Sequence, residues 1–127
     1  MKKIALILIV GVLFLTACAG PRQKLSPQAN VALKTANVYY AQRDTDKAQV
    51  YYEQVLRDNP DHVHALTRMG DIALHNGESF ADRSVEFNRS AYGYYSRAVK
   101  NYEGFTDLKD EDYIEIRNLK RRMDGAW

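Results

Sequence analysis

Apolar residues recur at the spacing of α-helices along most of the chain, and no segment has a convincing strand pattern. A Ser-Pro pair at residues 26–27 is typical of a helix start and predicts a first helix that ends near Gln42. After a polar break at residues 43–45, a second helix is predicted over residues 46–58, which an Asn-Pro-Asp sequence ends. The two stripes are Ala29, Ala32, Ala36 and Tyr39, then Ala48, Tyr51, Tyr52, Val55 and Leu56. Together they predict a helical hairpin.

Three more helices are predicted downstream. One covers residues 63–74 and is followed at residues 75–77 by a His-Asn-Gly sequence that resembles a helix C-cap signal. After a loop, a longer helix is expected over residues 82–101, and a last one over residues 110–123. The last helix begins with acidic residues and ends with basic ones, which suits the helix dipole. The predicted fold class is therefore all-α.

The two predicted hairpins are related by an internal repeat. A shift of 34 residues places Ala36 on Gly70, a pair of small residues suited to a close crossing of two helices. A shift of 43 residues aligns residues 48–56 with residues 91–99. The difference between the two shifts means that the second hairpin carries nine extra residues, within the segment 78–90.

These residues resemble the landmarks of tetratricopeptide repeats over residues 29–102. The first unit has Ala36, Tyr39, Ala48, Tyr52, Val55 and Pro60, and the second has Leu66, Met69, Gly70, Ala91, Tyr95 and Ala98. The second unit departs from the family pattern by its insertion and by Glu103 at the place of a closing proline. The resemblance implies two helical hairpins within a domain over residues 27–127, with the predicted 110–123 helix capping the open end of the stack.

In tetratricopeptide repeats the first helix of each hairpin lines a concave groove that binds peptides, so the resemblance implies such a groove here. We expect Asn37 to hydrogen-bond a peptide backbone, and Tyr40 and Leu33 to supply apolar anchors. This groove lacks the paired Lys or Arg positions that would hold a C-terminal carboxylate. The expected partner-binding residues are Asn30, Leu33, Asn37, Tyr40, His64, Thr67, Asp71 and His75.

Tyrosines stand in adjacent pairs at residues 39–40, 51–52 and 94–95, and a purely structural interpretation of these pairs stays open beside the binding groove. In it, Tyr39, Tyr52 and Tyr95 pack in the core, and their neighbours, Tyr40 among them, pack against the next helix. Two hairpins are also fewer than the three that usually make a solenoid stable alone. The last helix, self-association or a partner could close the stack, and the insertion with Phe80 offers a second contact surface.

The N-terminus has the pattern of an export signal. Two lysines precede an apolar stretch over residues 4–15, which is shorter than a membrane span. The sequence Leu15-Thr16-Ala17-Cys18 resembles a bacterial lipobox, which implies a signal peptide over residues 1–17 and acylation of Cys18. Residues 18–26 would then form a tether, and Ala19 resembles the outer-membrane sorting class. We expect a lipid-anchored protein on the periplasmic face of the outer membrane, or on the exported side of a single membrane.

Charge and cysteine content narrow the function classes. The chain of 127 residues has 18 Lys and Arg against 16 Asp and Glu. Two of the lysines belong to the predicted signal peptide, so its removal would leave equal numbers of basic and acidic residues. A neutral domain lacks the basic excess of a nucleic-acid binder. The single cysteine excludes a disulfide scaffold and, once acylated, leaves no thiol for chemistry.

No motif for catalysis or cofactor binding is found. His62, His64 and His75 do not have the spacing of a metal site, and the acidic segment 107–112 lacks the pattern of a calcium loop. There is no nucleophile beside a histidine, no glycine-rich phosphate loop and no cofactor fingerprint. We therefore expect no enzyme activity, no cofactor and no metal.

These patterns favour an adaptor that binds another envelope protein. By analogy with small repeat lipoproteins, the preferred process is assembly of a pilus or a secretion system at the outer membrane. Two alternatives stay open: a docking regulator of a peptidoglycan-modifying enzyme, and a self-assembling structural lipoprotein of the envelope. A direct binder of glycan or a small ligand would need an aromatic-lined pocket, for which the expected groove residues offer little.

Overall fold

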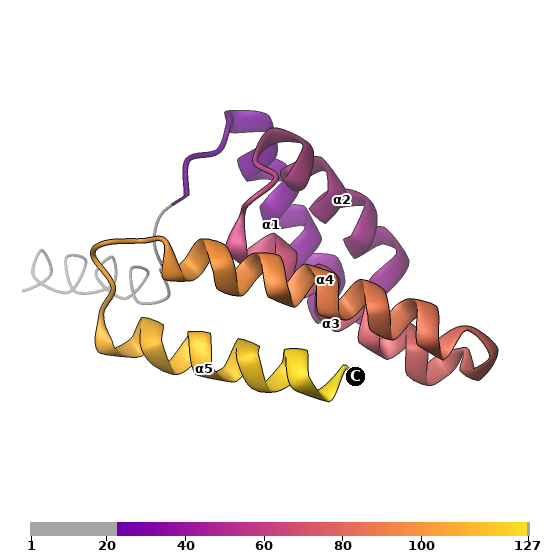
Figure 1. Cartoon of the computed structure of the whole chain (residues 1–127). Coiled ribbons are helices and arrows are strands. Elements are labelled where there is room, and N and C mark those ends of the chain that lie inside the picture. Colours follow the sequence, from indigo (N-terminus) through magenta and orange to yellow (C-terminus); the bar gives the residue numbers. More distant parts are fainter. Residues whose placement is uncertain (1–22, 127) are drawn as a thin grey trace, which may run out of the picture.

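The computed structural model describes residues 23–126, and every regular element in this part of the chain is a helix. The elements are α1 (Pro27–Ala41), α2 (Thr45–Asp58), α3 (Val63–Ser79), the short 3₁₀-helix η2 (Ala81–Arg83), α4 (Ser84–Glu103) and α5 (Asp110–Gly125). The pairs α1/α2 and α3/α4 form two hairpins, and α5 lies along α4 (Figure 1). The predicted all-α fold of two hairpins and a C-terminal helix is confirmed.

Local sequence explains the first hairpin. The Ser26 hydroxyl accepts a hydrogen bond from the N–H of Ala29 at 3.1 Å and so caps α1, with a proline at the first helical position. The Asp44 carboxylate accepts the N–H of Lys47 at 3.3 Å and caps α2. Between the two helices Arg43 has a φ of 61°, the left-handed conformation that reverses the chain after a helix.

The segment before α1 is bound to the rest of the fold. The Gln23 side chain donates a hydrogen bond to the carbonyl of Asp61 at 2.8 Å and accepts one from the N–H of Val63 at 2.5 Å. Asp61 lies in the turn between α2 and α3, and Val63 is the first residue of α3. The predicted tether of residues 18–26 is therefore not free along its whole length, because its described part is attached to this turn.

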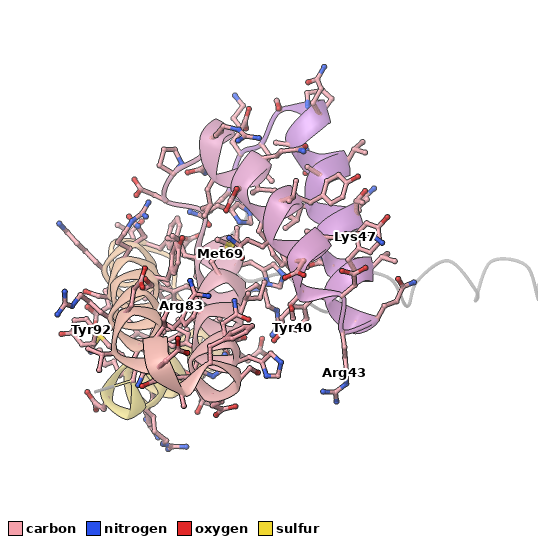
Figure 2. All side chains as sticks on the ribbon, turned by 90° about the vertical axis from the view of Figure 1, so that its right-hand side faces the viewer. Tyr40, Arg43, Lys47, Met69, Arg83 and Tyr92 are labelled. Carbon is pink, nitrogen blue, oxygen red and sulfur yellow. The ribbon has the colours of Figure 1, made fainter. Side chains whose placement is uncertain are left out.

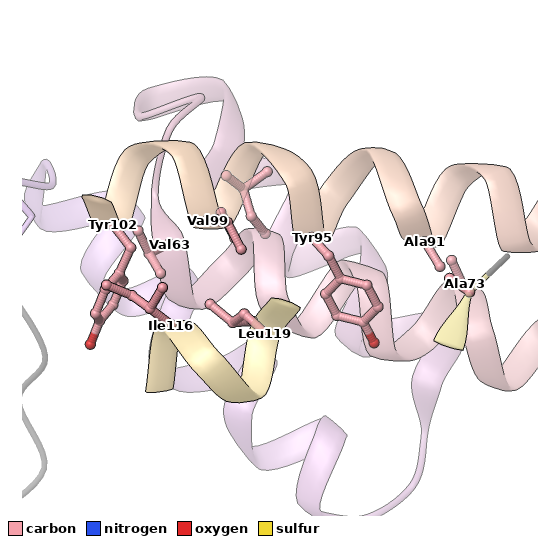
Figure 3. Close-up of a cluster of buried hydrophobic side chains, with 11 residues drawn as sticks. Val63, Ala73, Ala91, Tyr95, Val99, Tyr102, Ile116 and Leu119 are labelled. Atoms are coloured by element: carbon pink, nitrogen blue, oxygen red, sulfur yellow. The ribbon is translucent and has the colours of Figure 1, made fainter. Parts of the chain in front are cut away.

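Two apolar clusters hold the helices together. The first joins α1, α2 and α3 and contains Ala32, Ala36, Ala48, Tyr52, Val55, Ala65, Met69 and Ile72. The second joins α3, α4 and α5 (Figure 3). In it Tyr95, Val99 and Tyr102 of α4 meet Ile116 and Leu119 of α5. Because α3 contributes to both clusters, it is the central helix of the fold.

Gly70 marks the closest approach between α3 and α4. A Cβ atom added at this residue would lie 2.6 Å from Cε1 of Tyr95, far inside van der Waals contact. Tyr95 is fully buried, and its ring occupies the space that a larger residue would need. The small residue expected here from the repeat therefore has a direct packing reason. At the equivalent position of the first hairpin, Ala36 is also fully buried.

The C-cap predicted at residues 75–77 is wrong. Helix α3 continues to Ser79, and Gly77 is a buried residue within it. A Cβ at Gly77 would lie 2.8 Å from Oδ1 of Asn88 and 3.3 Å from Cβ of Phe87. This glycine thus allows α4 to approach α3, and the burial gained between the helices outweighs the local tendency to stop.

The nine-residue insertion lengthens the second hairpin. The end of α3 and the start of α4 extend beyond the first hairpin (Figure 1). There the rings of Phe80 and Phe87 lie 6.2 Å apart, and the Arg83 guanidinium lies within 5.5 Å of both ring centroids. Phe80 is 49% exposed, which suits the second contact surface that the sequence suggests for the insertion.

Candidate functional site

The expected binding residues lie on the first helices of the two hairpins, α1 and α3, and we call this surface the α1–α3 face. Tyr40 lies between the first hairpin and the rest of the fold, whereas Arg43 extends away from it (Figure 2). Side-chain hydrogen bonds cross directly from α1 to α3 at Tyr40 and at Asn37. The face is therefore a surface with a fixed internal arrangement.

Asp71 of α3 is the centre of this arrangement. Its carboxylate accepts hydrogen bonds from the hydroxyls of Tyr95 at 2.7 Å and Tyr40 at 3.3 Å. It also forms ion pairs with Arg68 at 3.2 Å and with Arg122 at 3.3 Å. These partners come from α1, α3, α4 and α5, so one carboxylate connects four of the five α-helices. Hydrogen bonds to a charged acceptor are stronger than those between neutral groups.

Arg68 also covers the ring of Tyr40. Its guanidinium carbon lies 4.6 Å from the ring centroid, within the range of a cation–π contact. Burial and the neighbouring Asp71 carboxylate raise the pKa of Tyr40, so its hydroxyl stays protonated and able to donate. The same two causes, with the hydrogen bond to Asp71, raise the pKa of Tyr95. Both tyrosines therefore act as donors to Asp71 at neutral pH.

A second polar group surrounds Asn37. Its Oδ1 accepts a hydrogen bond from the Tyr52 hydroxyl at 2.7 Å and lies 2.9 Å from Nε2 of His64. Because the amide oxygen can only accept, Nε2 of His64 carries the proton. Desolvation of the His64 ring, and then the positive charge of Arg68, lower the pKa of His64 to about 4. His64 is therefore neutral at pH 7 and is suited to hydrogen bonding.

The other expected residues are placed differently. The Asn30 amide donates to the carbonyl of Leu25 at 3.3 Å and is exposed, and His75 is exposed further along α3. Leu33 is half-buried against the first apolar cluster. The expectation for Thr67 is corrected: it is buried, and its hydroxyl donates to the carbonyl of Val63 one turn earlier. Thr67 therefore offers little surface to a partner.

The structure also adds two basic residues that were not expected on this surface. Arg68 lies three residues before Asp71, on the same helix, a spacing that could have indicated the pair. Arg122 is 51 residues away in sequence and reaches Asp71 only because α5 packs on α4. The face thus carries two guanidinium groups, but both share the single Asp71 carboxylate, so they do not form a pair free to bind a carboxylate of a ligand.

The tyrosine pairs combine both interpretations that the sequence left open. Tyr52 and Tyr95 are fully buried in the core, and Tyr39 stacks on Tyr51 with ring centroids 5.6 Å apart. Tyr40 packs against the next hairpin and still borders the α1–α3 face. Its hydroxyl is bound to Asp71 and Arg68 covers one face of its ring, so only the remaining exposed part of this half-buried side chain is available to a ligand.

Within residues 23–126, no group of three or more His, Asp or Glu side chains is placed to hold a metal ion. None of the helices described here is long and apolar enough to cross a membrane. The sequence Leu15-Thr16-Ala17-Cys18, on which the lipid-anchor prediction depends, lies outside the described residues.

Comparison with known families finds one match. Residues 31–62 match the model of the tetratricopeptide repeat, a range that covers most of α1, all of α2 and the turn before α3. No curated protein and no solved structure matches the chain. The first hairpin is thus a tetratricopeptide-like repeat, a unit that generally binds other proteins or peptides and is typically not catalytic.

Proposed function

We propose that this protein is an adaptor that binds another protein through the α1–α3 face and performs no reaction. The observation that carries the proposal is the set of hydrogen bonds that fixes Asn37, Tyr40 and Asp71 across two helices. Side chains that are already ordered lose little conformational entropy when a partner binds. Asn30 and His75 lie toward the two ends of the same face, and both are exposed.

The chemistry of the face suits an extended or helical peptide segment. The Asn37 amide oxygen is used internally, but its amide nitrogen can donate to a peptide carbonyl. The Tyr40 ring and the half-buried Leu33 offer apolar contact beside it. With Arg68 and Arg122 neutralised in part by Asp71, the face favours a neutral or weakly acidic segment over a strongly charged one.

The test uses substitutions that leave the hydrogen bonds of Asn37, Tyr40 and Asp71 intact. Replacing Tyr40 or Asn37 by alanine would also break contacts to Asp71 or Tyr52, so such variants test folding and binding together. Asn30→Arg combined with His75→Arg instead changes two exposed residues of the face. The matched control, Ser90→Arg with Thr106→Arg, changes two exposed polar residues on α4 and the following loop.

The measurement is crosslinking in cells, followed by affinity capture and mass spectrometry. We expect one envelope component to be captured by the wild type and by the control, and to be lost in the face variant. Equal capture by all three forms would contradict the use of this face. Capture of only further copies of this chain would instead favour a self-assembling envelope component.

We further propose that the adaptor is anchored by lipid at Cys18, after cleavage of residues 1–17. The support is the cationic start, the short apolar stretch and the lipobox-like sequence that ends in the single cysteine. Because Gln23 is attached to the α2–α3 turn, the linking segment shortens to residues 18–22, which can span at most about 18 Å. Cys18→Ser should abolish labelling with a palmitate analogue and leave an uncut precursor; normal processing would contradict the anchor.

Ala19 after the acylated cysteine favours the outer membrane as the destination. For the process, we propose assembly of a pilus or secretion system, on the ground of analogy with small repeat lipoproteins. The identity of the captured partner distinguishes this process from docking of a peptidoglycan-modifying enzyme.

A further inference from the structure

The packing order of the helices leaves one position unfilled at the end of the stack. Helix α2 packs against α1 and α3, and α4 packs against α3 and α5. Each second helix of a hairpin therefore lies between two first helices, and α5 takes the place of a third first helix. Among the described residues, no helix occupies the equivalent place on the other side of α5 (Figure 1).

The surface at this position is hollowed and largely apolar. A hollow of about 530 Å³ lies between the end of α4, the following loop and α5. It is lined by Glu103, Phe105, Leu108, Tyr113, Ile116, Arg117 and Lys120, and we call it the α5 docking face. Tyr113 is 56% exposed, which is a high exposed fraction for an aromatic residue beside an apolar hollow.

The charged residues at the rim of the hollow indicate which charge an occupant would carry. Lys120 forms an ion pair with Glu103 at 2.5 Å, which leaves Arg117 without an acidic counterpart among the lining residues. The net positive charge favours an occupant with acidic side chains next to its apolar stripe. This charge is local, since the chain as a whole is nearly neutral.

The fold itself provides a template for the shape of the occupant. Helix α2 presents Ala48, Tyr52 and Val55 to its neighbours, and all three are fully buried. Helix α4 repeats the pattern with Ala91, Tyr95 and Ala98, which are also fully buried. A helix that packs beside α5 in a similar way would present a comparable stripe at i, i+4 and i+7, with its small residues against the large side chains of Tyr113 and Arg117.

A second copy of this chain fits the face poorly. If two α5 helices paired antiparallel through the hollow, the symmetry axis would pass near Arg117, because the α5 lining residues run from Tyr113 to Lys120. The two Arg117 guanidinium groups would then meet across the axis, and like charges in contact oppose association.

We propose that the α5 docking face binds an amphipathic helix of another protein, one that carries a small-aromatic-small stripe flanked by acidic residues. The occupant completes a third hairpin with α5. This site is separate from the α1–α3 face, so it does not depend on the proposed adaptor function of that face.

The test measures binding of two synthetic helical peptides to the purified full chain by fluorescence anisotropy. Both peptides have about 18 residues, or about five helical turns, with the Ala-Tyr-Ala stripe. One has glutamate at the flanking positions, and its matched control has lysine there. We expect the acidic peptide to bind about tenfold more tightly than the basic one, because close charge pairs add to affinity and specificity.

Variants at exposed residues locate the site. Arg117→Glu should remove the preference for the acidic peptide, and Tyr113→Ser should weaken its binding about tenfold, as expected for loss of an aromatic contact. Arg121→Glu changes an exposed residue of α5 outside the lining set and should bind like the wild type. Far-UV circular dichroism checks that each variant keeps its helices.

Four results would overturn the proposal. The first is equal binding of the two peptides. The second is an affinity for the acidic peptide that Arg117→Glu leaves unchanged. The third is a dimer of the full chain in sedimentation that Tyr113→Ser converts to a monomer, which would make a second copy the occupant. The fourth is loss of peptide binding in the Asn30→Arg/His75→Arg variant with binding kept in Tyr113→Ser, which would place the peptide on the α1–α3 face.

Discussion

The contact between Gly70 and Tyr95 sets how closely α3 and α4 approach. An added Cβ would lie 2.6, 2.8 and 2.9 Å from three atoms of the Tyr95 ring. The ring cannot move aside easily, because it is fully buried and its hydroxyl is bound to Asp71. We expect Gly70→Ala to lower the free energy of unfolding by about 1–3 kcal/mol, as is usual for overpacking. Urea denaturation followed by circular dichroism measures this change.

Gly93 provides the matched control on α4. A Cβ at this position would meet no atom within 4 Å, and the residue lies inside the helix. Gly93→Ala should therefore raise the free energy of unfolding by about 0.5–1 kcal/mol, since alanine favours a helix more than glycine does. If both substitutions stabilise the protein, the close contact at Gly70 is not the reason for its small size.

Single residues also show how far sequence reasoning can go. The small residue at position 70 was predictable, because the repeat places it on Ala36. The distant partners of Asp71 were not, since Tyr95 and Arg122 lie 24 and 51 residues away in sequence. Periodicity tells which face of a helix a residue occupies. It does not tell which distant side chain completes its hydrogen bonds.

At the scale of the helices, the apolar stripes predicted all five, and the main error was local. The Asn-Gly sequence after residue 75 resembles a stop signal, but Gly77 is buried where α3 meets Asn88 and Phe87. A stop signal has an effect of about 1 kcal/mol, which packing of a neighbouring helix readily exceeds. The extension of α3 by packing also explains why the insertion forms longer helices rather than a free loop.

Helix α5 depends on α4 more than on any other helix. Leu119 is fully buried between them, and Ile116 is 6% exposed. We expect Leu119→Ala to lower the free energy of unfolding of α5 by about 2–5 kcal/mol, because the substitution removes a buried side chain and leaves a cavity. Hydrogen exchange measured by mass spectrometry should show faster exchange in α5, with little change in α1 and α2.

Ile114 offers the control within the same helix, because it is 55% exposed and lies outside the cluster. Ile114→Ala should change stability by less than about 0.5 kcal/mol. Equal acceleration of exchange in all helices of the Leu119→Ala variant would mean that α5 unfolds only together with the whole domain.

At the scale of the whole molecule, the fold is two clusters joined through α3. One cluster uses α1 and α2, and the other uses α4 and α5. Asp71 adds a polar connection between them, since Tyr40 belongs to the first hairpin and Tyr95 and Arg122 to the elements of the second cluster. A stack of two hairpins has a single interface between repeats, so we expect this polar connection to add to the coupling that the apolar packing of α2 on α3 provides.

Asp71→Asn tests that coupling while keeping the size of the side chain. The amide oxygen can still accept from Tyr95, but Arg68 and Arg122 lose their acidic partner. We expect the free energy of unfolding to fall by about 1–3 kcal/mol, the usual range when a partly buried charged partner is removed. Asp107→Asn changes an exposed aspartate in the loop before α5 and should leave stability unchanged.

Thermal unfolding of Asp71→Asn should also broaden, because the first hairpin can then open before the second cluster. A single sharp transition at the wild-type midpoint would mean that apolar packing of α3 alone couples the two hairpins.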